Sequence, residues 1–190
     1  MKLEEIPLTR PINEKVEWAK ICYRDFRQCF LGDPLAGTLL KQLKKASEAS
    51  RNEMAKVGID HYCGECEALE GGSCCGAGLE DKYSGCLLLI NLLLEVQLPE
   101  ERFDPRGCFF LGPKGCLLIA RHVICLNYLC KKITDRIEPL KLKALREKEG
   151  MELEYLFLVY ERTKKLLRGM KAEAISGVSG LFFSRSPYPT

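Results

Sequence analysis

The chain has 190 residues, of which 46% are hydrophobic, so it can bury a substantial core and does not depend on cross-links alone. Its formal net charge at pH 7 is +3, and this near-neutral balance gives no support for nucleic-acid binding. The longest apolar run, residues 86–94, is far shorter than the roughly 20 residues that a membrane helix needs. We therefore expect a globular protein that binds neither nucleic acid nor membrane.

The N-terminal part of the chain predicts two helices. Apolar residues recur at helical spacing over residues 13–30, and Asn13 is a suitable N-cap for this first helix. Asp33 followed by Pro34 is typical of the start of a second helix, and Gly58 is a natural stop for it.

The middle of the chain alternates between loops and apolar helices. Residues 61–78 are rich in glycine and cysteine and poor in aliphatic side chains, so we expect neither a helix nor a long strand there. Helix returns over residues 79–98, and Pro99 ends it. Residues 100–115 are predicted to form a loop, and residues 116–133 a mostly apolar and therefore buried helix.

The C-terminal part indicates one long helix over residues 139–170, or two helices that meet at Gly150. The tail that starts at Ser176 is expected to be irregular. We interpret the charged residues near the start of this helix as a solvated face: Lys141, Lys143, Arg146, Glu147, Lys148 and Glu149.

Eight of the eleven cysteines fall in the middle third of the chain, and their spacing indicates a metal site: Cys63, Cys66, Cys74, Cys75, Cys108, Cys116, Cys125 and Cys130. Disulfides are the alternative. The first residues are acidic and contain prolines where a signal peptide needs an apolar run, which predicts a cytoplasmic protein with reduced thiols. The odd number of cysteines also argues against a complete disulfide framework.

The local sequence around these cysteines favours metal binding. Cys63 and Cys66 form a CxxC pair, in which both sulfurs can face one ion. The adjacent Cys74 and Cys75 stand in a glycine-rich loop, where they have little value for packing. Cys116 follows a glycine and would open a helix, whose N-terminal dipole would stabilise a thiolate.

The order of the cysteines resembles that of the YkgJ-type cysteine-cluster proteins, which carry a zinc- or iron-chelating domain. The resemblance covers residues 63–130, implies the same eight metal ligands, and leaves both helical flanks unexplained. One departure is Arg121-His122, which stands where the family has Arg-Pro before its seventh cysteine. The resemblance rests on Cys63-x2-Cys66, Cys74-Cys75, Gly107-Cys108-Phe109-Phe110-Leu111, Gly115-Cys116, Arg121-x3-Cys125 and Tyr128-x-Cys130.

These observations predict a mainly α fold, in which a helical domain packs around irregular cysteine-rich metal-binding loops. We expect a single domain over residues 1–190, with residues 61–133 as the cysteine-cluster metal-binding core. Residues 1–60 and 134–175 would be helical flanks, and residues 176–190 an irregular tail. The apolar helix between the two cysteine segments must then bring them together.

The identity of the metal stays open between an iron–sulfur cluster and zinc. Structural zinc sites often pair two CxxC turns, and this chain has only one. Adjacent cysteines chelate a single tetrahedral ion awkwardly and serve two metals, or two irons of a cluster, more easily. Glycine-rich surroundings also suit N–H to sulfur hydrogen bonds, so we prefer iron–sulfur slightly.

The leading hypothesis is a metal-binding cysteine-cluster protein that works in redox chemistry or electron transfer with a protein or redox partner. One alternative is a structural zinc module that mediates protein–protein interaction. Another is a metal-dependent enzyme, although no catalytic residue or substrate is identifiable. The chain contains no P-loop and no GxGxxG, so a nucleotide cofactor is unsupported.

The remaining cysteines and histidines are interpreted conservatively. Cys22 and Cys29 lie seven residues apart on nearly one helix face and are taken as buried thiols, as is Cys86. His61 is expected to be a surface histidine, and His122 a hydrogen-bonded core histidine, with metal ligation as the alternative for both.

Arg121 is the cation closest in sequence to the second cysteine group. It can offset the charge of a thiolate cluster or hold an anionic partner. The alternative is an ordinary salt bridge to an acidic residue such as Glu80 or Asp81.

Overall fold

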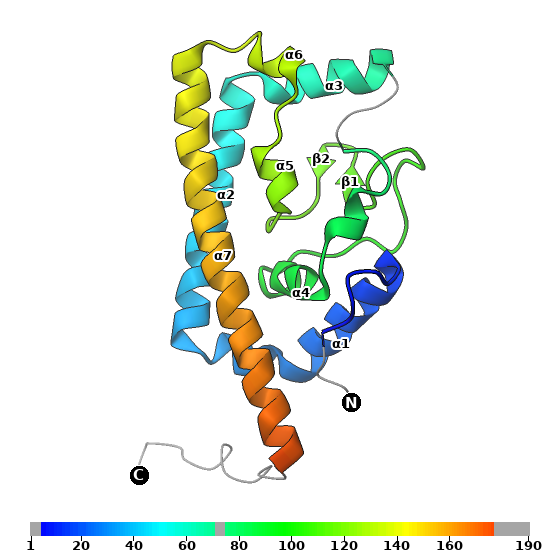
Figure 1. Cartoon of the computed structure of the whole chain (residues 1–190), viewed down its shortest axis with the longest axis vertical. Coiled ribbons are helices and arrows are strands. Elements are labelled where there is room, and N and C mark those ends of the chain that lie inside the picture. Colours follow the sequence, from blue (N-terminus) through cyan, green and yellow to red (C-terminus); the bar gives the residue numbers. More distant parts are fainter. Residues whose placement is uncertain (1–4, 71–74, 177–190) are drawn as a thin grey trace.

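The computed structural model describes residues 5–70 and 75–176, except for the side chains of residues 64, 66–70 and 173–176. The predicted mainly α fold is confirmed (Figure 1). None of the described helices combines the length and the apolar character that a membrane span requires. The elements are α1 (Ile12–Leu31), α2 (Pro34–Lys56), α3 (Ile59–Glu70), the 3-10 helix η1 (Leu79–Lys82), α4 (Gly85–Leu93), β1 (Leu111–Gly112), β2 (Gly115–Cys116), α5 (Val123–Asn127), α6 (Lys131–Thr134) and α7 (Pro139–Ser176).

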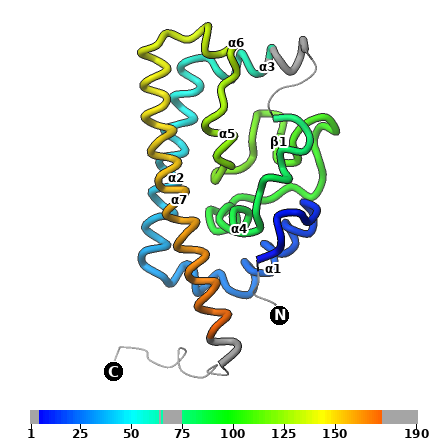
Figure 2. The backbone as a smooth tube through the Cα atoms, in the orientation of Figure 1, coloured from blue at the N-terminus to red at the C-terminus, as the bar shows by residue number. Residues whose placement is uncertain are grey.

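The two longest helices, α2 and α7, lie side by side along the long axis of the molecule (Figure 2). Helix α1 packs on α4, and α4 in turn contacts α7. Every residue of α4 except Leu92 is buried. A helix that is apolar on all sides has to be enclosed, and α4 accordingly forms the middle of the core.

The start of α2 follows the prediction. The carboxylate of Asp33 accepts a hydrogen bond from the backbone N–H of Ala36 at 2.7 Å, so Asp33 is the N-cap. The same carboxylate accepts from Nε of Arg162 on α7 at 2.9 Å, which ties the start of α2 to its neighbour. After α2, Gly58 has a φ of 79°, a left-handed conformation that suits glycine at a helix end.

The start of α1 and one of its cysteines differ from expectation. The helix already begins at Ile12, after Pro11, so Asn13 is not its N-cap. Cys22 is buried as predicted, but Cys29 is exposed, because at this end of α1 the buried side chain is Phe30. Cys86 is fully buried in α4, as expected.

Residues 61–78 were predicted to lack a helix, which is wrong for their first part, because α3 spans Ile59–Glu70. The physical reason is that Gly64 is the only glycine between residues 61 and 70, and it is followed by good helix formers such as Glu65, Ala68 and Leu69. The other glycines of this stretch all come later.

The predicted helix over residues 79–98 is shorter than expected. Its first residues form η1, and α4 then begins with Ser84 as N-cap, whose hydroxyl accepts from the N–H of Leu87 at 3.2 Å. Helix α4 ends at Leu93. Glu95 then has a φ of 66°, which a right-handed helix does not accommodate.

The predicted buried helix over residues 116–133 is wrong. Instead, β2 is followed by an extended segment and by the two short helices α5 and α6. Polar side chains replace the helical hydrogen bonds of this segment. Oδ1 of Asn91 accepts from the N–H groups of Ile119 (2.9 Å) and Ala120 (3.0 Å), and its Nδ2 donates to the carbonyl of Ala120 at 2.9 Å. Ser47 on α2 donates to the carbonyl of Ile119 at 3.2 Å.

Helix α7 is continuous from Pro139 to Ser176, so Gly150 does not divide it. Gly150 is exposed and has nothing within 4 Å of where a Cβ atom would be. Neighbouring turns and the packing against α2 therefore maintain the helix despite the weak propensity of glycine. Ser176 is the last residue of α7, and the rest of the predicted tail lies outside the described residues.

Candidate metal centre

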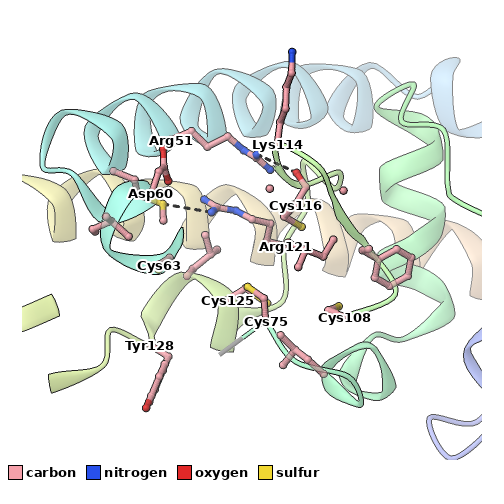
Figure 3. A pocket seen from close by; sticks show the side chains of 18 of the residues that line it. Arg51, Asp60, Cys63, Cys75, Cys108, Lys114, Cys116, Arg121, Cys125 and Tyr128 are labelled. Carbon is pink, nitrogen blue, oxygen red and sulfur yellow. Dashed lines mark hydrogen bonds between the residues drawn. The ribbon is translucent and has the colours of Figure 1, made fainter. Parts of the chain in front are cut away.

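A pocket of about 490 Å³ lies between α2, α3, α5 and the hairpin of β1 and β2. Five of the eight predicted metal ligands line it: Cys63, Cys75, Cys108, Cys116 and Cys125. Figure 3 shows these side chains around a common space, whereas Lys114 and Tyr128 point away from it. The five cysteines come from separate segments of the chain, so the fold and not local sequence brings them to one pocket.

The other three predicted ligands are Cys66, Cys74 and Cys130. The side chain of Cys66 and the whole of Cys74 lie outside the described residues. Cys130 does not line the pocket, but it packs with Cys63 against the same small apolar cluster. Among the side chains that the structure describes, no three histidine, cysteine or acidic groups lie close enough together to hold a metal ion.

The two cysteine segments are joined directly by backbone hydrogen bonds. The N–H of Cys108 donates to the carbonyl of Cys75 at 2.6 Å, and the N–H of Ala77 donates to the carbonyl of Arg106 at 2.8 Å. An isolated β-bridge pairs Gly76 with Gly107 between them. These contacts fix Cys75 relative to Cys108 without help from the helix that separates them in sequence.

The side chain of Glu80 also holds this junction together. Its Oε2 accepts from the N–H groups of Gly78 (3.0 Å) and Phe109 (3.3 Å), one on each cysteine segment. Its Oε1 pairs with Arg102, which also donates to the carbonyl of Gly107 at 2.7 Å. Burial opposes the charge of Glu80, but the hydrogen bonds from Arg102 and the backbone outweigh it, so its pKa is lowered.

The thiol of Cys108 is buried, and burial raises its pKa to about 12, although a hydrogen bond from the backbone of Phe110 opposes the rise. In the absence of a bound cation, Cys108 is therefore a neutral thiol at neutral pH. A metal ion is the partner that would allow it to ionise in this position.

Tyr83 is a buried hydrogen-bonding group of the site that sequence reasoning missed. Its hydroxyl lies 3.5 Å from Sγ of Cys125 and accepts a hydrogen bond from the N–H of His122 at 3.1 Å. Since that oxygen already accepts, its proton is available to the sulfur. Burial raises the pKa of Tyr83, so the proton stays on it. No motif in the sequence marks this residue.

Arg121 forms a buried ion pair with Glu152 on α7, with Nη2 and Oε2 at 2.8 Å. It also donates to Oγ of Ser50 at 3.4 Å and to Sδ of Met54 at 3.5 Å. Arg121 therefore forms the salt bridge that we considered, but its partner is neither Glu80 nor Asp81. Glu80 is paired with Arg102, and α7 presents Glu152 to Arg121. Arg121 nevertheless lines the pocket beside the cysteines.

The two histidines contribute to local structure. His61 is exposed and lies 3.3 Å from the carboxylate of Glu65, as expected of a surface histidine. His122 is half-buried and caps α5, because its Nδ1 accepts from the N–H of Ile124 at 3.2 Å. Burial and then Lys82 lower the pKa of His122, which favours this neutral acceptor form.

The charged face predicted at the start of α7 is only partly solvated. Lys141, Lys143, Glu147 and Lys148 are exposed, but Glu149 is 1% exposed and lines the pocket. Sequence spacing did not reveal this, since the burial of Glu149 depends on the pocket wall that α7 completes.

No protein-family model matches the chain, and neither a curated protein nor a solved structure matches it. The resemblance to the YkgJ-type family therefore stays a prediction from the order of the cysteines.

Proposed function

We propose that this chain is a metal-binding cysteine-cluster protein whose site holds an iron–sulfur cluster or zinc. The observation that carries the proposal is the convergence of five predicted ligands, from five separate segments, on one pocket. Cysteine sulfur is a preferred ligand of both zinc and iron–sulfur clusters. A bound metal would draw these thiols together with Cys66, Cys74 and Cys130.

Electron transfer is the use that we propose for an iron–sulfur cluster at this site. When bound, such a cluster supplies one-electron redox chemistry. The hydroxyl of Tyr83 can donate to Cys125, and hydrogen bonds to ligand sulfur tune a metal site. Arg51 and Arg121 line the same pocket and would offset the negative charge of thiolates. The redox partner would be another protein in a reducing compartment such as the cytoplasm.

Metal content and absorption of protein purified without oxygen test the proposal. We expect iron and acid-labile sulfide with a visible absorption band. Cys108→Ala and Cys125→Ala should lower metal content at least severalfold, whereas Cys29→Ser, on the exposed face of α1, should leave it unchanged. Stoichiometric zinc without iron would exclude the cluster, and protein without either metal would exclude the proposal.

A structural zinc module that docks a partner is the second candidate. Large apolar side chains are exposed beside the cysteines: Leu117 (44%), Val123 (44%), Ile124 (42%) and Tyr128 (54%). Exposed apolar side chains of this size can take part in protein–protein contact. Zinc content, together with a loss of partner binding after Tyr128→Ser at unchanged metal content, would favour this candidate over electron transfer.

A further inference from the structure

Glu149 has a buried carboxylate oxygen without a hydrogen-bond partner. The residue is 1% exposed and lines the pocket. Its Oε2 accepts from Nη1 of Arg146 at 2.7 Å, but its Oε1 makes no hydrogen bond with any residue that the structure describes. Buried polar atoms almost always have a partner, so an exception in a pocket wall needs an explanation. Glu149 therefore places a carboxylate oxygen without a described donor in the wall of this pocket.

Arg51 carries a positive charge, and no carboxylate among the side chains that the structure describes is in ion-pair contact with it. Its guanidinium donates to the carbonyl oxygens of Cys116, at 3.3 Å, and of Leu118, and both of these acceptors are neutral. The nearby Arg121 is already paired with Glu152. Burial and then Arg121 lower the pKa of Arg51, and they outweigh the opposing effects of Cys116, Glu152 and Asp60.

The rest of the pocket suits the body of a small molecule. Its volume of about 490 Å³ falls in the usual range for small-molecule sites, roughly 300–1,000 Å³. Arg121, which also lines the pocket, acts on the pKa of both Arg51 and Glu149, so both groups lie within its electrostatic range. Apolar side chains from α2, α3, α5, α6 and the link between α5 and α6 complete the wall: Met54, Ile59, Leu126, Leu129 and Ile133.

We propose that this pocket binds a small organic acid that has an apolar chain and carries a hydroxyl or amino group next to the acid. The acid group pairs with Arg51, the hydroxyl or amino group donates to Oε1 of Glu149, and the chain packs on the apolar wall. Thiolates can balance the charge of Arg51, but they cannot supply a proton donor to Glu149. The proposal shares its pocket with the metal site and does not require a metal.

Four matched probes test this assignment by calorimetry on the full chain: leucine, leucic acid, isocaproic acid and leucinol. Isocaproic acid lacks the donor, and leucinol lacks the acid. We expect leucine or leucic acid to bind at least about tenfold more tightly than isocaproic acid and than leucinol, because each missing group leaves a buried partner unsatisfied.

Variants assign the two contacts. In Glu149→Gln the amide oxygen stays on Arg146 and turns the amide N–H₂ toward the pocket, so the preference for leucic acid over isocaproic acid should disappear. Arg51→Gln should weaken binding of the acids at least about tenfold and leave leucinol unchanged. The exposed residues Glu154 and Arg168 provide the controls Glu154→Gln and Arg168→Gln, which should change neither.

Failure of all four probes to bind at millimolar concentration would overturn the proposal, as would equal affinity for leucic and isocaproic acid. Either result would indicate that water, and not a bound acid, donates to Oε1 of Glu149. If Arg51→Gln does not fold, the comparison of leucine with leucinol on the natural chain still tests the role of the acid group. Metal analysis of the same samples distinguishes this proposal from the proposed metal site. Ligand binding by metal-free protein would support the ligand pocket and not the metal site.

Discussion

At the scale of the residue, burial gives identical side chains different chemistry. Burial raises the pKa of Cys22 to about 12, with smaller contributions from Asp25 and Glu5, whereas Cys29 on the same helix is exposed. Only a thiolate reacts quickly with an alkylating reagent. Helix α1 therefore carries one thiol open to reagents and one that the core protects.

Iodoacetamide at about pH 8 should accordingly label Cys29 rapidly, while Cys22 and Cys86 stay unlabelled until the protein unfolds. Peptide mapping by mass spectrometry, with and without urea, measures this difference. Rapid labelling of Cys22 in the folded protein would contradict the packing of α1 against α4.

Glu80 connects the two cysteine segments through its carboxylate. Glu80→Gln should lower the free energy of unfolding by about 1–3 kcal/mol, because Arg102 and a backbone N–H group lose a charged acceptor. Urea unfolding measures the change, and Glu101→Gln at the exposed neighbouring position is the control.

The pH dependence of the Glu80 contribution follows from its lowered pKa. The folded state holds the charged carboxylate more strongly than the unfolded chain, so the contribution is complete above the ordinary pKa of 4.5. It is lost as the pH falls below that value. The difference in stability between the natural chain and Glu80→Gln should therefore shrink in acid, and a constant difference would contradict the lowered pKa.

At the scale of the element, the extended segment after β2 depends on Asn91. Asn91 is fully buried, and its side chain bonds three backbone groups of this segment. Asn91→Leu should cost about 3 kcal/mol or more, since it leaves several buried backbone groups unsatisfied. It should also lower the metal content, because the segment connects Cys116 in β2 to Cys125 in α5. Unfolding curves and metal analysis test both effects, with Asn52→Leu on the exposed face of α2 as the control.

Elements that depend on local interactions could be predicted from the sequence, and elements that depend on distant residues could not. Asp33 and Gly58 could be assigned from sequence because their roles are decided within a few residues. The segment after β2 could not, because its apolar composition suits a helix and its real partners Ser47 and Asn91 are far away in sequence.

The candidate site likewise has one part that the sequence indicates and one part that only the structure reveals. The order of the cysteines indicated which thiols belong together, and the structure brings five of them to one pocket. The supporting side chains, Tyr83, Arg51 and Glu149, stand in no motif and are recognised only by burial and hydrogen bonds.

At the scale of the whole molecule, the helical pair and the cysteine region are expected to respond differently to metal removal. Chelation of a bound metal should lower the melting temperature by several degrees, because binding energy contributes to folding. Hydrogen exchange should rise over residues 75–130 and change little where α2 packs on α7. A uniform rise over the chain, or no change, would show that the metal is not coupled to the cysteine region.

The position of α7 also sets an order of assembly. Arg162 on α7 pairs with Asp33, 129 residues earlier, and Glu152 pairs with Arg121 in the pocket wall. Every cysteine is therefore translated before the helix that closes the pocket, which begins at Pro139. Contacts of such long sequence separation form late in folding. Under the proposed function, the nascent chain would have to keep its thiols reduced until α7 docks, and metal binding would follow translation.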